Sequence, residues 1–165
     1  MHELNTAKPL LLIDVDGVIS LFGFEPSTPP AGNFALVDGI AHFLSATAGE
    51  HLRALEEDYE LVWCTGWEEK ANEYLPLALG LAGPLPHLVL GASGPGGDRH
   101  WKLEAIDRFA GPARPLAWLD DAHDESCTAW ASSRPGPTLL LTTQPAVGLT
   151  PAHVEELRAW AARLG

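Results

Sequence analysis

Short apolar segments alternate along the chain with segments in which apolar residues recur at helical spacing. The apolar segments predict strands at 9–15, 61–64, 87–90, 116–119 and 138–141, and the periodic segments predict helices at 37–57, 68–79, 101–109, 125–132 and 151–164. This alternation favours a parallel sheet with helices on both faces. We therefore expect an α/β fold, a Rossmann-like three-layer sandwich with a five-stranded parallel sheet, in a single domain over residues 1–165.

Two segments depart from this pattern. Residues 22–33 are rich in Pro, Gly and Ser and predict a loop or a small hairpin. Residues 91–98 are dense in glycine and predict a mobile loop. The last helix has a defined start, with Thr150 as N-cap and Pro151 at the first helical position.

Polar side chains and glycines follow three of the predicted strands. They are Asp14, Asp16 and Gly17 after the first strand, Thr65 and Gly66 after the second, and Asp120 and Asp121 after the fourth. Lys102 opens a helix just after the glycine-dense segment. Because the carboxyl ends of parallel strands share one edge of the sheet, we expect these groups to converge there. Burying acids at a strand end is unfavourable without a cation.

Such a set suits phosphoryl transfer through an aspartyl phosphate. Asp14 is the expected nucleophile, and Asp16 is the expected group that protonates the leaving oxygen and then activates water. Thr65 offers a hydroxyl to a phosphate oxygen, and Lys102 offers positive charge. The expected cofactor is Mg²⁺, because acids that hold Mg²⁺ neutralise the repulsion between carboxylate and phosphate; the candidate ligands are Asp14, Asp16 through its backbone carbonyl, Asp120 and Asp121.

With these residues in this order, the chain resembles the haloacid dehalogenase-like (HAD) phosphohydrolase superfamily. The segment Asp14-Val15-Asp16-Gly17-Val18 is similar to its first motif, 61–65 to its second, Lys102 to its third and Asp120-Asp121 to its fourth, covering about residues 10–124. The resemblance implies that Asp14 is the nucleophile and Asp16 the general acid/base. It also implies that Asp121 binds Mg²⁺ directly and that Asp120 is its neighbour one layer further from the metal. Dehalogenases of the superfamily lack the second acid, so Asp16 favours phosphate esters.

The resemblance also has departures. The chain leaves little room for the cap domain that many HAD enzymes carry, which implies an open site for large substrates such as protein or polynucleotide ends, or a cap supplied by another subunit. The segment from Trp63 to Glu68 with Asn72, and Trp118 to Asp121, also resemble a HAD domain associated with RNA repair proteins. Gly17, Gly66 and Trp67 are the candidate substrate-binding positions, with packing as the alternative for Trp67 and Asn72.

Charge and composition narrow the partners. The chain carries 10 Lys and Arg against 22 Asp and Glu, a formal net charge of −12, which disfavours broad binding to nucleic acid or anionic membranes. We therefore expect a phosphorylated substrate held locally through the metal, with nucleic acid only as a substrate end. Cys64 and Cys127 have no metal or disulfide spacing and predict buried thiols. The N-terminus resembles no targeting segment, so we expect a cytoplasmic protein.

Two other functions use similar residues. A phosphoacceptor domain of the response-regulator type also places acids, a hydroxyl and a lysine around Mg²⁺, although there the phosphorylated acid follows the third strand. A non-catalytic module could keep the phosphate site and serve a partner protein. Next to the fourth motif, we interpret Asp124 as a helix N-terminal acid and His123 as a solvated loop residue, with contact to substrate as the alternative for His123.

Overall fold

A four-stranded parallel sheet forms the centre of the computed structural model, which describes residues 8–91 and 99–165. Its strands are β1 (Leu10–Ile13), β5 (Glu60–Trp63), β6 (Leu116–Asp120) and β7 (Thr138–Thr142), in the order β5-β1-β6-β7. β1 therefore lies between β5 and β6, in parallel register with both. The α/β class is confirmed, and the carboxyl ends of three strands meet around the end of β1.

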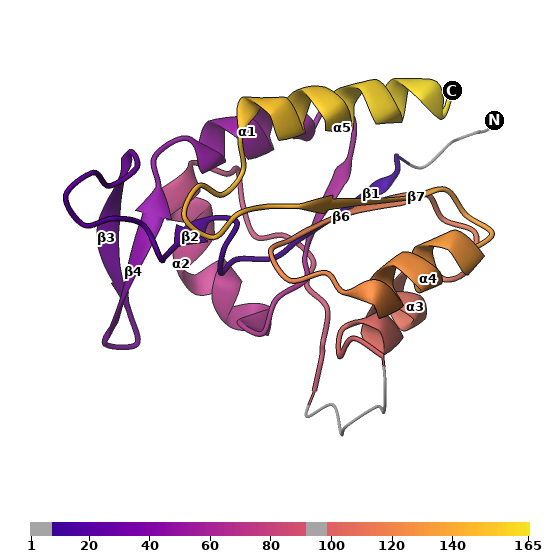
Figure 1. Cartoon of the computed structure of the whole chain (residues 1–165), viewed down its shortest axis with the longest axis horizontal. Coiled ribbons are helices and arrows are strands. Elements are labelled where there is room, and N and C mark those ends of the chain that lie inside the picture. The colour runs from indigo at the N-terminus through magenta and orange to yellow at the C-terminus, as the bar shows by residue number, and fades with distance from the viewer. Residues whose placement is uncertain (1–7, 92–98) are drawn as a thin grey trace.

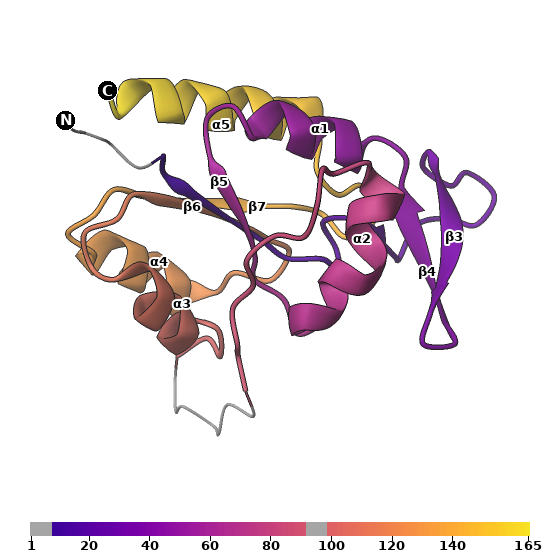
Figure 2. The same ribbon diagram turned by 180° about the vertical axis from the view of Figure 1, so that it is seen from behind.

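Helices cover both faces of this sheet (Figures 1 and 2). They are α1 (Ala48–Leu55), α2 (Ala71–Leu79), preceded by the 3-10 turn η1 (Glu68–Lys70), α3 (Leu103–Ala110), α4 (Glu125–Ser133) and α5 (Pro151–Arg163). Because side chains alternate between faces along a strand, Leu11 and Ile13 pack with α1, α2 and α5, whereas Leu10 and Leu12 pack with α3 and α4. The predicted three layers are thus present around two apolar cores.

The prediction of a fifth strand at 87–90 is wrong in its detail. This segment lies beside β5 but forms only a single parallel bridge between Trp63 and His87, with Leu88 N donating to Trp63 O over 3.0 Å. Pro84 and Pro86 come just before the contact, and a proline lacks the N–H that a ladder needs. The prediction of a mobile loop at 91–98 falls, apart from Gly91, outside the described residues.

The prediction of a helix over 37–57 is also wrong in its first half. The strand β4 (Ile40–Ser45) occupies this half instead. It belongs to a small antiparallel sheet, which we call the flap sheet, together with β2 (Ser20–Leu21) and β3 (Gly32–Val37), in the order β2-β4-β3. Asp38 and Gly39 join β3 to β4 with φ of 52° and 80°, the backbone of a tight hairpin turn that Asp-Gly favours. Only 48–55 remains helical, as α1.

The predicted helix starts in the C-terminal half are confirmed. Thr150 caps α5 by accepting a hydrogen bond from His153 N, and Pro151 is the first helical residue. Asp124 caps α4 by accepting from Cys127 N, which confirms its interpretation as a helix N-terminal acid. These caps fix the ends of the helices that flank the carboxyl edge of the sheet.

Candidate metal centre and active site

Asp14 is the first residue after β1, and the strands on both sides hold it in place. Its backbone N donates to Leu119 O over 3.0 Å, and the preceding carbonyl, Ile13 O, accepts from Cys64 N over 2.8 Å. Its carboxylate Oδ1 accepts from Val15 N at 2.8 Å and lies 3.2 Å from Lys102 Nζ. Only 7% of the residue is exposed, and its Oδ2 accepts no hydrogen bond from the described residues. One oxygen of a buried acid is thus held and the other is free.

Lys102 connects Asp14 to Asp120 at the end of β6. Lys102 directly precedes α3 and is 3% exposed, and its Nζ donates to Asp120 Oδ2 at 2.7 Å and to Cys64 O at 3.0 Å. Burial alone would lower the pKa of Lys102, but the nearby carboxylates of Asp14 and Asp120 raise it overall. Burial opposes ionisation of Asp120, yet the Lys102 ammonium keeps the pKa of Asp120 below its usual range. Lys102 is therefore a fixed cation.

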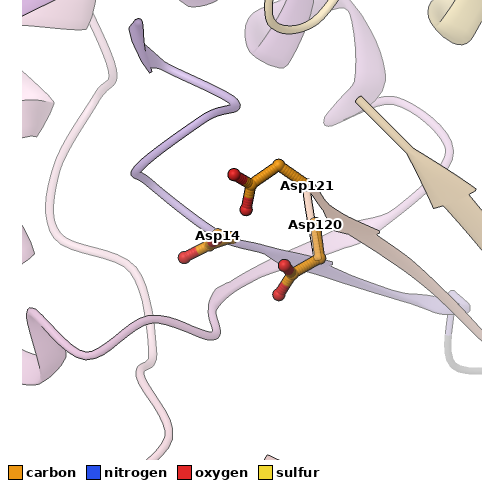
Figure 3. Close-up of side chains that lie close together, drawn as sticks. All are labelled: Asp14, Asp120 and Asp121. Atoms are coloured by element: carbon orange, nitrogen blue, oxygen red, sulfur yellow. The ribbon is translucent and has the colours of Figure 1, made fainter. Parts of the chain in front are cut away.

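Asp121, the residue after β6, brings a third carboxylate close to those of Asp14 and Asp120. Neighbouring residues at a strand end point in opposite directions, and Figure 3 shows the carboxylates of Asp120 and Asp121 on either side of the strand, with Asp14 beside them. The loop after β1 makes room for Asp121 at Gly17, which has a φ of +86°, and a Cβ there would lie 2.3 Å from Asp121 Oδ2. Gly17 therefore serves the turn and the position of Asp121.

Asp14, Asp120 and Asp121 form what we call the acid cluster, in which one oxygen from each lies within 4.8 Å of the others. Three carboxylates face one buried ammonium, so the cluster has an excess of negative charge. Burial raises the pKa of Asp14 above its usual range despite Lys102, and burial together with Asp120 raises the pKa of Asp121. Asp120 uses both oxygens on protein donors, Lys102 Nζ and Ala122 N, which leaves Asp14 and Asp121 better placed to bind a cation. A hard divalent cation such as Mg²⁺ fits this donor set.

Asp16 lies outside the acid cluster. Its side chain is 53% exposed, and Trp67 Nε1 donates to its Oδ2 at 3.2 Å. His42 Nδ1 lies 3.8 Å from Asp16 Oδ1, and the His42 and Trp67 rings meet edge to face with centroids 4.9 Å apart. The side chain of Asp16 is therefore separate from the metal candidates, and its environment suits a group that exchanges protons with water.

Thr65 and Gly66 follow β5 next to Asp14. Thr65 is buried, and its Oγ1 accepts from Trp67 N at 3.1 Å, so the hydroxyl shapes the turn that presents Trp67. At Gly66, a Cβ would meet only Trp101 at 3.7 Å, an ordinary contact, so sterics alone do not require glycine there. Asn72 packs rather than lining the site, because its side chain bonds Trp63 Nε1 and the backbone of Leu85.

The interpretation of His123 as a solvated loop residue is right about the loop after β6 but not about full solvation, because the residue is half-buried. Its ring packs edge to face on Trp118, with centroids 4.5 Å apart, and its Nδ1 shares a hydrogen bond of 2.8 Å with Thr142 Oγ1. Burial lowers the pKa of His123 to about 4, so the ring is neutral near pH 7. Trp118 on the preceding strand thus covers part of this histidine ring.

Sequence analysis missed His42 and Glu68. His42 lies on β4, in the segment predicted to be helical, so nothing in the sequence pattern brought it near Asp16. Glu68 has a φ of 50°, and its Oε2 accepts from Leu90 N at 2.9 Å and Gly91 N at 3.1 Å. Glu68 thereby ties the turn after β5 to the backbone of Leu90 and Gly91.

Comparison with models of known families and with curated proteins finds no match to this chain. Within 8–91 and 99–165, no helix has the length and apolar character that crossing a bilayer requires.

Proposed function

We propose that the protein is a Mg²⁺-dependent phosphohydrolase of the HAD-like type that acts on a phosphomonoester through phospho-Asp14. The observation that supports this most directly is the pairing of Asp14 with Lys102 inside the acid cluster, while Asp16 stands two residues away in contact with solvent. The order β5-β1-β6 supports the four-motif resemblance, because it surrounds Asp14 with Thr65 on one side and Asp120 and Asp121 on the other.

Asp14 and Asp16 carry the two chemical steps of the proposal. In the first, Asp14 Oδ2 bonds to phosphorus as the ester P–O bond breaks, and protonated Asp16 gives its proton to the leaving oxygen. In the second, Asp16 takes a proton from water as the water oxygen bonds to phosphorus. The bond to Asp14 then breaks, inorganic phosphate leaves, and both acids return to their starting states.

The remaining polar groups hold charge in place. Mg²⁺, when bound by Asp14 and Asp121, would neutralise the phosphate and the attacking carboxylate. Lys102 keeps Asp14 oriented by its contact with Oδ1, and Asp120 orients Lys102. The Thr65 hydroxyl proton and nearby amides are available to a phosphate oxygen.

Hydrolysis of p-nitrophenyl phosphate tests this function. We expect activity with Mg²⁺, none in EDTA, and recovery when Mg²⁺ is restored in excess. Asp14→Asn should lower kcat by on the order of 10³-fold or more, because it removes the nucleophile. Asp58→Asn, which changes an acid paired with Arg158 on α5, is the matched control and should keep wild-type kcat. Full activity in EDTA, or in Asp14→Asn, would contradict the proposal.

The alternatives give different results in the same assays. A phosphoacceptor of the response-regulator type would be labelled stably by acetyl phosphate without turnover, and a non-catalytic module would bind phosphate without hydrolysis. The exposed Asp16 next to the acid cluster favours turnover over both, because a stable phosphoprotein has no need of a group that activates water. A role in RNA repair would require preference for polynucleotide ends, which the net charge of −12 disfavours.

A further inference from the structure

The flap sheet and the loop after β1 line an open hollow of about 600 Å³. This volume is in the range of roughly 300–1,000 Å³ that small-molecule sites occupy. Asp16 lines one part of it, and the other side chains that define its chemistry are Phe22, Phe24, Phe34, His42 and Phe43. The residue assigned to protonate the leaving oxygen thus opens onto a mainly aromatic space.

Three of the aromatic side chains, Phe24, Phe34 and Phe43, pack into one group, and Phe22 lines the same hollow. The ring centroid of Phe43 lies 4.8 Å from that of Phe24 and 5.0 Å from that of Phe34, both at steep angles. Phe43 is buried, but Phe22 and Phe34 are 49% and 69% exposed. Exposing large rings together beside a polar site is unfavourable in water and marks a surface that a ligand covers. Rings at steep mutual angles offer faces and edges to a planar partner.

The charge of the hollow limits what it can hold. None of the described residues that line it is a lysine or an arginine, and Asp16 is negative when ionised. A second phosphate or a polyanionic chain would therefore have no cation to meet there. The occupant that fits is a neutral planar ring.

We propose that the hollow binds the leaving group of the substrate and that this leaving group carries a planar aromatic ring, such as a nucleobase or an aryl group. This inference rests on the proposed function, because Asp14 and Asp16 set where phosphate ends and leaving group begins. The substrate class is a phosphomonoester with one phosphate and an aromatic ring on an alkyl leaving oxygen. Phe22 and Phe34 are then specificity-determining residues that play no part in the bond-breaking steps.

Matched substrates test the inference. Adenosine 5′-monophosphate and ribose 5-phosphate share a primary alkyl leaving oxygen and differ by the base, and benzyl phosphate and ethyl phosphate differ by an aryl ring. We expect kcat/KM to favour the aromatic member of at least one pair by about 5-fold or more, since one stacked ring contributes roughly that factor or more. Which pair responds distinguishes a nucleobase from a simple aryl group.

Two variants locate the effect. Phe22→Ala combined with Phe34→Ala should bring the ratio of kcat/KM within each pair close to one, chiefly by lowering kcat/KM for the aromatic member. Phe109→Ala is the matched control, because Phe109 is also exposed but lies on α3, away from the flap sheet (Figure 1). Equal kcat/KM within both pairs in the wild type would overturn the inference and leave the phosphatase proposal intact.

Binding of adenosine gives a result that does not depend on turnover. Adenosine should shift the backbone amide NMR signals of residues 20–24 and 34 in the wild type but not in the double variant. Ribose should shift these signals in neither protein. If no phosphoester is hydrolysed, the proposed function fails and with it the assignment of a leaving group, and the adenosine titration still decides whether the hollow binds a planar ring. Shifts confined to the hollow would support it, and their absence would overturn it.

Discussion

The carboxyl edge of the parallel sheet and the flap sheet treat acidic side chains in opposite ways. At the sheet edge, Asp14 is buried between two strands, and protein groups hold one of its oxygens. On the flap side, Asp16 is open to solvent and its contacts, Trp67 and His42, come from a turn and from β4. Only one residue separates these two acids in the sequence.

This difference indicates a division of roles. A residue that acts as nucleophile and metal ligand needs a fixed position and unbalanced negative charge nearby. The hydrogen-bond ladder of the parallel sheet fixes the position, and the three carboxylates of the acid cluster, which face a single ammonium, supply the charge. A group that transfers protons needs access to water and to the leaving group, which a surface position beside a hollow provides. Each prediction below perturbs one side of the comparison, and the largest effect comes first.

Asp16→Asn should have the largest effect on the flap side. Without a titrating group at this position, kcat for an ester with an alkyl leaving group should fall by about 10²–10⁴-fold. The affinity for Mg²⁺, measured by calorimetry, should stay within a few-fold of the wild type, because the side chain of Asp16 lies outside the acid cluster. Loss of Mg²⁺ binding in this variant would show that the two regions are not separate.

Lys102→Met should have the largest effect on stability at the sheet edge. It leaves the buried carboxylates of Asp14 and Asp120 without their cation, and breaking a buried pair from one side costs about 3–5 kcal/mol. Urea denaturation measures this loss, which saturating Mg²⁺ should reduce because the metal replaces positive charge.

Lys70→Met is the control for Lys102→Met. Lys70 pairs with Asp38 on the flap turn, but both side chains are about half exposed, so its replacement should change stability far less. Equal losses in the two lysine variants would contradict the assignment of a special electrostatic role to the sheet edge.

Two glycines give the smallest and most closely matched comparison. Gly17 and Gly39 have φ of 86° and 80°, so alanine at either should be strained by about 1–2 kcal/mol. A Cβ at Gly17 also meets Asp121, whereas at Gly39 it meets nothing within 4 Å. Gly17→Ala should therefore weaken Mg²⁺ binding, and Gly39→Ala should not. Equal Mg²⁺ affinity in both variants, measured by calorimetry, would argue against Asp121 as a metal ligand.

Sequence reasoning reached the sheet edge more successfully than the flap sheet. Runs such as Leu10 to Ile13 are apolar on both faces, which only a strand buried between helices explains, so the positions of Asp14 and Asp120 followed from them. The flap strands are short and partly exposed, and the apolar positions of β4 run on into those of α1, so the pattern over 37–57 predicts one helix. The Asp38-Gly39 turn was the local sign of a hairpin, but the contacts of His42 with Asp16 depend on how the hairpin packs, which periodicity does not encode.

Trapping the covalent intermediate tests the central claim most directly. In Asp16→Asn, p-nitrophenyl phosphate should still phosphorylate Asp14, because its leaving group needs little protonation, while the second step is slow for want of a group that activates water. Absorbance should show a burst in which one equivalent of p-nitrophenol is released per protein molecule. Peptide mass spectrometry after acid quench should then find one phosphoryl group, on Asp14. Nitrophenol release without a phosphorylated Asp14, or a phosphoryl group on another residue, would contradict the account.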